Sequence, residues 1–168
     1  MVKILHNNMR ACWRMVMGGV FLFCMITSAG FAASDYMLSK GQTVYVPVYS
    51  NIFTAPKQIP FHLANILSIR NTDMFNAIQL TSADYYDTKG RLVRQYYNRP
   101  IMLAPLESTY IYLPEDDVVG GFGANFIVRW VSAKEVNAPI IECLMIGMKG
   151  GQGISFVSNG QVIKENTR

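Results

Sequence analysis

The chain has 168 residues, of which 51% are hydrophobic and 15% are charged, and its formal net charge is +4. Much of that charge comes from Lys3, Arg10 and Arg14 near the start, and without them twelve basic residues face eleven acidic ones. A near-neutral domain lacks the basic surface that nucleic-acid binding requires. We therefore expect no nucleic-acid partner.

The first 33 residues have the pattern of an export signal. The three basic residues precede an uncharged run over 15–33, and Gly30 and Ala32 are small residues where signal peptidase reads the chain. We expect a helical signal peptide over 1–32 and a β domain over 33–168, located in the periplasm or outside the cell. The alternative is an uncleaved inner-membrane anchor with the domain facing the periplasm, because nineteen uncharged residues can span a bilayer. Only that anchor would contact the membrane.

The rest of the sequence predicts strands, because short β-branched and aromatic runs alternate with turn residues and no 3.6-residue apolar period is sustained. The first predicted strand, Thr43 to Tyr49, carries Pro47, which favours an edge position. A second strand covers 61–69. The clearest hairpin joins 78–87 to 91–97 through a turn that ends at Gly90.

The second half continues the pattern. Pro100 and Pro105 predict that the chain crosses between sheets before a strand over 109–113. A glycine-containing loop over 114–123 leads to a central strand in which Trp130 is the largest core side chain. Strands over 139–148 and 152–157 follow, then an Asn159-Gly160 turn and a frayed tail over 164–168. About eight short strands predict an all-β, two-sheet antiparallel β-sandwich of immunoglobulin-like type, with a small β-barrel as the alternative.

Residues that could support catalysis are few after the signal. His62 and Cys143 are the remaining histidine and cysteine, whereas the usual zinc and copper sites need two or more such ligands. We expect His62 to face solvent and Cys143 to be buried in a strand. The glycine loop over 120–123 lacks the Lys-Ser/Thr of a phosphate loop and precedes a strand, so we expect its glycines to shape the backbone. The sequence predicts neither an enzyme nor a cofactor.

Two groups of side chains remain as binding candidates. The acidic loop Glu115-Asp116-Asp117 offers oxygen ligands for calcium, with a solvated loop as the alternative. Outward tyrosines offer apolar area with a polar tip, suited to protein interfaces or sugar stacking, or they cover a sheet face by cross-strand pairing. The tyrosines that we select as a possible interaction surface are Tyr45, Tyr49, Tyr86 and Tyr97.

Several segments together resemble a bacterial family known as domain of unknown function 3124. Phe122 departs from the pattern, because a small residue is expected there. The resemblance implies an exported envelope protein and supplies no catalytic residue. The segments that carry it are 41–49, 67–73, 84–94, 105–109, 120–126 and 152–156.

These observations predict an exported, non-enzymatic module that binds another envelope protein through an edge strand or the tyrosines. The alternative is a small-ligand binder that takes a glycan or calcium through the exposed tyrosines or the acidic loop.

Overall fold

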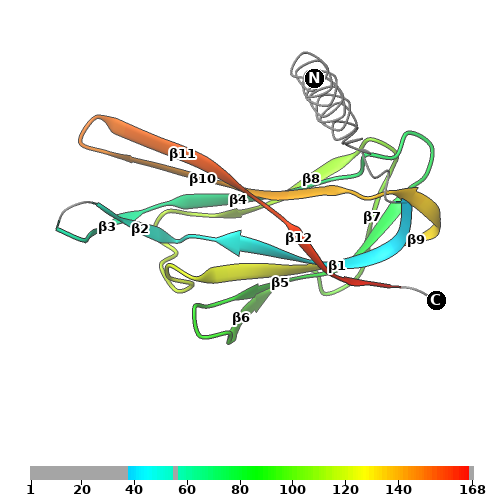
Figure 1. Ribbon diagram of the computed structural model, residues 1–168, viewed down its shortest axis with the longest axis horizontal. Helices are drawn as coiled ribbons and strands as arrows, with labels where there is room; N and C mark the ends of the chain where they lie inside the picture. Colours follow the sequence, from blue (N-terminus) through cyan, green and yellow to red (C-terminus); the bar gives the residue numbers. More distant parts are fainter. Residues whose placement is uncertain (1–37, 55–56, 167–168) are drawn as a thin grey trace, which may run out of the picture. The chain divides into compact units, whose positions relative to one another are not determined.

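The structure is a computed structural model that describes residues 38–54 and 57–166, and it is built from strands (Figure 1). The predicted signal peptide lies outside the described residues. Within the described part of the chain, no helix has the length and apolar character needed to cross a membrane.

The first sheet has the order β12-β1-β9-β5-β6, and the short strand β7 also pairs with β5. All of its pairs are antiparallel. Its strands are β1 (Leu38–Val48), β5 (Ile78–Tyr86), β6 (Leu92–Gln95), β7 (Ile101–Leu103), β9 (Ala124–Asn137) and β12 (Gln161–Glu165).

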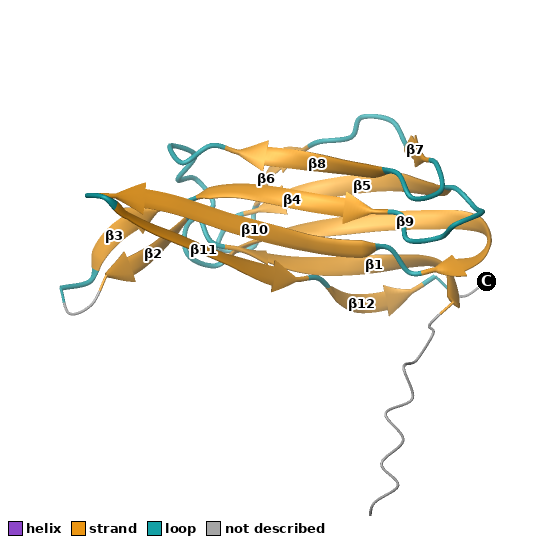
Figure 2. Cartoon of the chain, turned by 90° about the horizontal axis from the view of Figure 1, so that it is seen from above, coloured by secondary structure: helices purple, strands orange, loops and turns teal. Residues whose placement is uncertain are grey.

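The second sheet has the order β11-β10-β4-β8 and is also antiparallel (Figure 2). It contains β4 (Ala64–Arg70), β8 (Ser108–Leu113), β10 (Ile140–Lys149) and β11 (Gln152–Asn159). A separate hairpin is formed by β2 (Asn51–Thr54) and β3 (Ile59–His62). The described part of the chain is therefore all-β, as predicted for the domain after the signal peptide. Neither large sheet closes on itself, so the alternative prediction of a small barrel is wrong.

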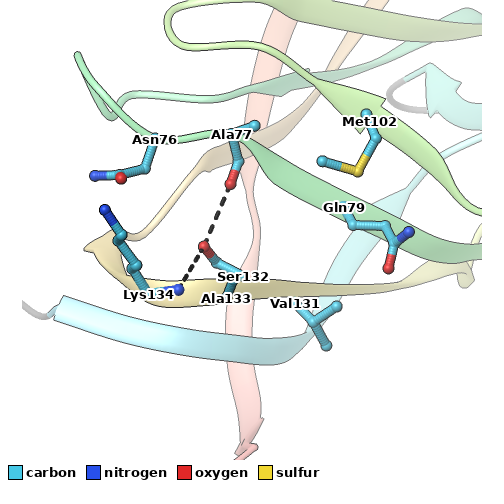
Figure 3. Close-up of a pocket in the computed structure, with 8 residues that line it drawn as sticks. All are labelled: Asn76, Ala77, Gln79, Met102, Val131, Ser132, Ala133 and Lys134. Atoms are coloured by element: carbon cyan, nitrogen blue, oxygen red, sulfur yellow. Dashed lines mark hydrogen bonds between the residues drawn. The ribbon is translucent and has the colours of Figure 1, made fainter.

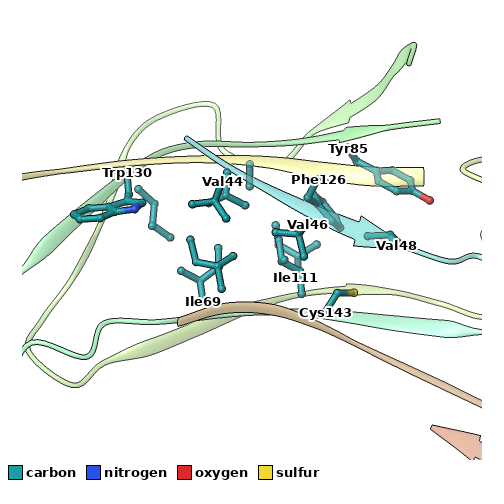
Figure 4. Packing of buried hydrophobic residues seen from close by; sticks show 14 of the residues in the cluster. Val44, Val46, Val48, Ile69, Tyr85, Ile111, Phe126, Trp130 and Cys143 are labelled. Atoms are coloured by element: carbon teal, nitrogen blue, oxygen red, sulfur yellow. The ribbon is translucent and has the colours of Figure 1, made fainter. Parts of the chain in front are cut away.

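The hydrophobic core draws on both large sheets, as the close-up in Figure 4 shows. Period-two alternation turns Val44 and Val46 of β1 inward, and on β9 Trp130 is completely buried. Ile69 and Cys143 contribute from the second sheet. Cys143 is completely buried and is a core side chain. This burial raises the pKa of its thiol to about 12. The predictions for Trp130 and Cys143 are confirmed.

The predicted hairpin and the predicted sheet crossing are both present. β5 and β6 pair around a turn in which Gly90 has a φ of +74°. One oxygen of Asp87, Oδ1, accepts hydrogen bonds from the amides of Lys89 and Arg91, so this carboxylate caps the turn. The chain then crosses from β7 in the first sheet to β8 in the second.

The edge position predicted from Pro47 is wrong, because β1 lies between β9 and β12. Pairing with β12 covers Gln42 to Tyr45 and stops before the proline. The Pro47 carbonyl accepts a hydrogen bond from the hydroxyl of Ser158 on β11. The N and C=O groups of one strand residue point to the same side of the strand. The Pro47 nitrogen therefore points to a side where no described strand pairs with β1 at this position, and its missing N–H breaks no ladder bond.

Two predictions near the C-terminus are also wrong. Asn159-Gly160 is the crossing from β11 to β12 in the other sheet, and a Cβ at Gly160 would lie 2.6 Å from the Ile141 carbonyl oxygen. A glycine is needed at position 160 because the Ile141 carbonyl lies too close for a side chain, and not because the chain forms a two-residue hairpin there. The described part of the tail is not frayed, because Lys164 and Glu165 pair with β1 and the amide of Asn166 donates to the Gly41 carbonyl.

Candidate binding groove between two hairpins

The glycine loop is fixed from two sides. The Ser50 amide donates to the Gly121 carbonyl (3.1 Å), and the amide of Thr88 donates to the Gly120 carbonyl (2.9 Å). A Cβ at Gly120 would lie 1.9 Å from the Tyr85 hydroxyl oxygen, so this position requires glycine. The Tyr85 and Ser50 hydroxyls are hydrogen-bonded (3.1 Å), and burial raises the pKa of Tyr85. The glycines therefore shape the backbone.

This anchored loop places Phe122 among other aromatic rings. Its ring centroid lies 5.2 Å from that of Tyr49 in an edge-on arrangement, and 5.8 Å from that of Phe53. On its other side, Tyr49 contacts Phe156 of β11 (5.8 Å, edge-on). We call Tyr49, Phe53, Phe122 and Phe156 the aromatic cluster. It joins three segments that are far apart in the sequence, because Tyr49 and Phe53 belong to the same stretch.

A cavity of about 600 Å³ opens beside this cluster, and we call it the hairpin groove. The β2–β3 and β10–β11 hairpins extend from the same end of the β domain in both views (Figures 1 and 2). Gly147 on β10 leaves space for the groove wall, because a Cβ there would lie 2.5 Å from the Phe61 ring. The groove is lined by Ile52, Phe53, Thr54, Phe61, Gln152, Gly153 and Ile154.

The groove is lined mainly by apolar side chains, and basic side chains lie around it. Phe53 is 51% exposed and Phe122 is 48% exposed, so the core buries only about half of each side chain. Neither 49–62 nor 144–158 contains Asp or Glu, whereas exposed Lys57, His62 and Lys149 lie in or beside the two hairpins. Contiguous exposed apolar surface with a charged rim is typical of binding sites.

The tyrosines selected from the sequence do not gather on one surface. Tyr45 and Tyr86 are half-buried on the outer face of the first sheet, in neighbouring cross-strand rows with Ile127 and Asn125. Tyr49 belongs to the aromatic cluster. Tyr97 packs against the core.

Two other tyrosines are far more exposed than those selected. Tyr110 and Tyr112 on β8 are 70% and 53% exposed. They lie on the edge of the second sheet farthest from β11.

The acidic loop does not gather its carboxylates. Glu115 and Asp116 are exposed, and the carboxylate of Asp117 lies 3.8 Å from the guanidinium of Arg94. In the part of the chain that the structure describes, no three His, Cys, Asp or Glu side chains are arranged to hold a metal ion. The exposed His62 and the buried Cys143 lie on different strands that do not pair with each other, β3 and β10.

A second hollow lies at the other end of β9, where its register with β1 is interrupted between Ser39 and Gly41 (Figure 3). Two cavities of about 320 and 440 Å³ share Val131, Ser132 and Ala133. The Ser132 hydroxyl donates to the Ala77 carbonyl and accepts from the Lys134 amide, so it is occupied within the fold. This lining offers no set of side chains typical of catalysis.

Of the aromatic cluster, only Tyr49 was selected from the sequence. Phe53 and Phe122 come together only in three dimensions, and neither lies in a strand with a clear alternating pattern. One signal was present, because a phenylalanine stands in a glycine loop where a small residue is expected.

The fold and the groove define an open, antiparallel all-β domain with a surface site lined mainly by apolar residues, and its described residues include no group of three His, Cys, Asp or Glu side chains that could hold a metal ion. The chain belongs to the family described as "Protein of unknown function (DUF3124)", whose model matches residues 41–163. No curated protein matches the chain.

A solved structure titled "Crystal Structure of Thermotoga maritima 1070" is similar at 9% identity and a TM-score of 0.46, covering 74% of this chain and 97% of that one. A likeness of this size decides neither fold details nor function.

Proposed function

We propose that this protein is an exported, non-enzymatic module that binds another envelope protein through the hairpin groove. The observation that carries the proposal is the pair of half-exposed rings, Phe53 and Phe122, beside a cavity of about 600 Å³. Aromatic side chains in a partly enclosed site supply most of the binding energy in many interfaces. Rings that the core leaves exposed gain that energy only when a partner covers them.

The scaffold suits this role. We assign it to the two-sheet sandwiches of immunoglobulin-like type, because two open antiparallel sheets enclose one core that contains a buried tryptophan. Export rests on the sequence pattern of residues 1–32. β1 starts at Leu38 and runs toward Ser50, so the first residue of β1 and the groove lie at opposite ends of the β domain.

The test is chemical cross-linking of the tagged, full-length protein in its own cells, comparing wild type with two alanine variants. Phe53→Ala removes a ring at the groove, and Tyr110→Ala removes an exposed ring at the far edge of the second sheet. We expect one protein partner to be captured by wild type and Tyr110→Ala and lost with Phe53→Ala. Equal capture by both variants would contradict the assignment to the groove.

Small-ligand binding is the second candidate, and the volume of the groove favours it specifically. About 600 Å³ lies within the usual range of small-molecule sites, and exposed rings are suited to stacking on sugars. Titration of the protein with a panel of glycans, followed by calorimetry, separates the candidates. Saturable binding lost with Phe53→Ala, in a protein that captures no partner, would favour the ligand.

A further inference from the structure

We propose that the partner contributes an extended segment that adds to the open edge of β11, with apolar side chains in the hairpin groove and acidic side chains toward the hairpin lysines. This inference rests on the proposed function and specifies how the partner is held.

β11 is an unprotected strand edge. It pairs with β10 over eight consecutive residue pairs without a register shift, and among the described residues no strand pairs with its other side. Natural edge strands are usually short, bulged, or interrupted by charge or proline. β12 carries Lys164 and Glu165, and β6 carries Arg94 in only four residues. β11 has eight residues, Gln152 to Asn159, with neither charge nor proline.

The backbone groups available at this edge follow from the hairpin turn. Gly150 and Gly151 have φ values of +60° and +79°, which defines a two-residue turn closed by a hydrogen-bonded Lys149–Gln152 pair. Hydrogen-bonded pairs alternate along an antiparallel ladder. The Gly160 amide donates to the Ile141 carbonyl, which is in phase with this alternation.

The N–H and C=O groups of the remaining residues therefore point to the open edge. Those residues are Gly153, Ser155, Val157 and Asn159.

In β11, the residues whose backbone groups bond to β10 have their side chains on one face of the sheet. The residues whose backbone groups point to the open edge have their side chains on the other face. Phe156 pairs with the buried Met145, and Ile154 pairs with Gly147, whose vacant side faces Phe61. Ile154 and Phe156 thus face the groove side. A strand added to β11 would place every second side chain on that same side, next to Phe53.

Charge complementarity specifies the partner further. Lys57 and Lys149 are exposed in or next to the hairpin turns, and the two hairpin segments contain no acidic residue. A segment with Asp or Glu beside its apolar residues matches this rim. A second copy of β11 carries no acidic side chain to supply it.

The test places a photoreactive benzoylphenylalanine at Phe53 of the full-length protein in its own cells. Ser155→Pro removes an outward amide without removing a β10 bond, and Ser155→Ala is its matched control. Ser155 is exposed. Val157 is exposed too, so Val157→Pro and its control Val157→Ala test a second position. We expect a covalent product with another protein that is retained with Ser155→Ala and lost with either proline. Thermal melting verifies that each variant is folded.

The lysines provide an independent arm that changes no backbone bond. The double variant Lys57→Glu/Lys149→Glu should lose the product, whereas Lys57→Arg/Lys149→Arg should retain it. Mass spectrometry of the product should identify an acidic segment with alternating apolar residues.

The outcomes separate the two proposals. Capture that is insensitive to proline at position 155 or 157 and to the lysine reversal would overturn strand addition and leave a side-chain interface intact. A product with a second copy of this chain or with lipid would also overturn it. No product from position 53, with wild-type levels of folded protein, would overturn the proposed function as well.

Discussion

The two ends of the β domain differ: one has a buried polar group with all its hydrogen-bond partners in the chain, and the other has apolar rings that are only partly buried. At the end where β4 finishes, the buried carboxylate of Asp73 accepts amide hydrogen bonds from Phe75 (2.9 Å), Asn76 (2.8 Å) and Asn137 (3.2 Å). At the hairpin end, the rings of Phe53 and Phe122 remain half-exposed. At the first end the carboxylate is satisfied by hydrogen bonds within the chain. At the hairpin end the aromatic rings stay partly exposed to solvent.

This difference separates stability from binding. Buried polar groups stabilise a fold only when each has a partner, and losing one partner costs the full desolvation of the other. Exposed rings contribute little to stability but bind a partner that covers them. Substitutions at the Asp73 end should therefore affect folding, whereas those at the groove should affect binding.

Asp73→Ala should cause the largest loss of thermal stability among the variants proposed here, because three amides lose their acceptor. Asp73→Asn keeps one acceptor oxygen and should lose less. The amide of Phe75 and the other hydrogen bonds hold the pKa of Asp73 below its usual value.

The pH dependence of Asp73 follows from that lowered pKa. Its stabilising contribution is present above the pKa of the unfolded carboxyl and is lost below about pH 4, as pH falls through the lower folded value. Thermal melts of wild type and Asp73→Asn at pH 7 and across pH 2 to 4 test this. A difference in melting temperature between wild type and Asp73→Asn that is the same at pH 2 as at pH 7 would contradict it.

Gly120→Ala should reduce the free energy of unfolding by about 1–3 kcal/mol, because its Cβ would overlap the Tyr85 hydroxyl. Tyr85→Phe removes that hydroxyl and should recover part of the loss when the two substitutions are combined. Urea unfolding of both single variants and the double variant measures the coupling. Purely additive losses would show that the Tyr85 hydroxyl is not the cause.

Phe53→Ala should change the free energy of unfolding by less than about 0.5 kcal/mol, because half of its ring is already exposed. Its effect should be confined to capture of the partner. Urea unfolding beside the cross-linking assay measures both quantities in one protein. A large loss of stability would mean that the aromatic cluster serves the fold.

Calcium should have the smallest effect. The carboxylates of Glu115, Asp116 and Asp117 are not arranged as a three-ligand site, so we expect equal melting temperatures in calcium and in chelator. A higher melting temperature in calcium that disappears with Asp116→Asn would revive the calcium hypothesis.

The sequence predicted those features that depend on local pattern. Alternation identified the inward valines of β1 and the buried Trp130, and turn chemistry identified the hairpin at Gly90. These features need only residues that are neighbours along the chain.

The features that failed depend on pairing between distant segments. Pro47 indicated an edge strand, but β12 from the far end of the chain covers only part of β1 and leaves the proline free. Asn159-Gly160 has the composition of a hairpin turn, but the glycine is needed because the Ile141 carbonyl leaves no room for a side chain. The groove was missed for the same reason, because Phe53, Phe122 and Phe156 meet only after both sheets form.

The most direct test of strand capture at the groove is amide hydrogen exchange of the protein with and without its captured partner. The account predicts slower exchange at Gly153, Ser155 and Val157 of β11, whose amides face the open edge, and no change in β8 at Tyr110 and Tyr112. Unchanged exchange across β11 in a stable complex, or protection confined to β8, would contradict it.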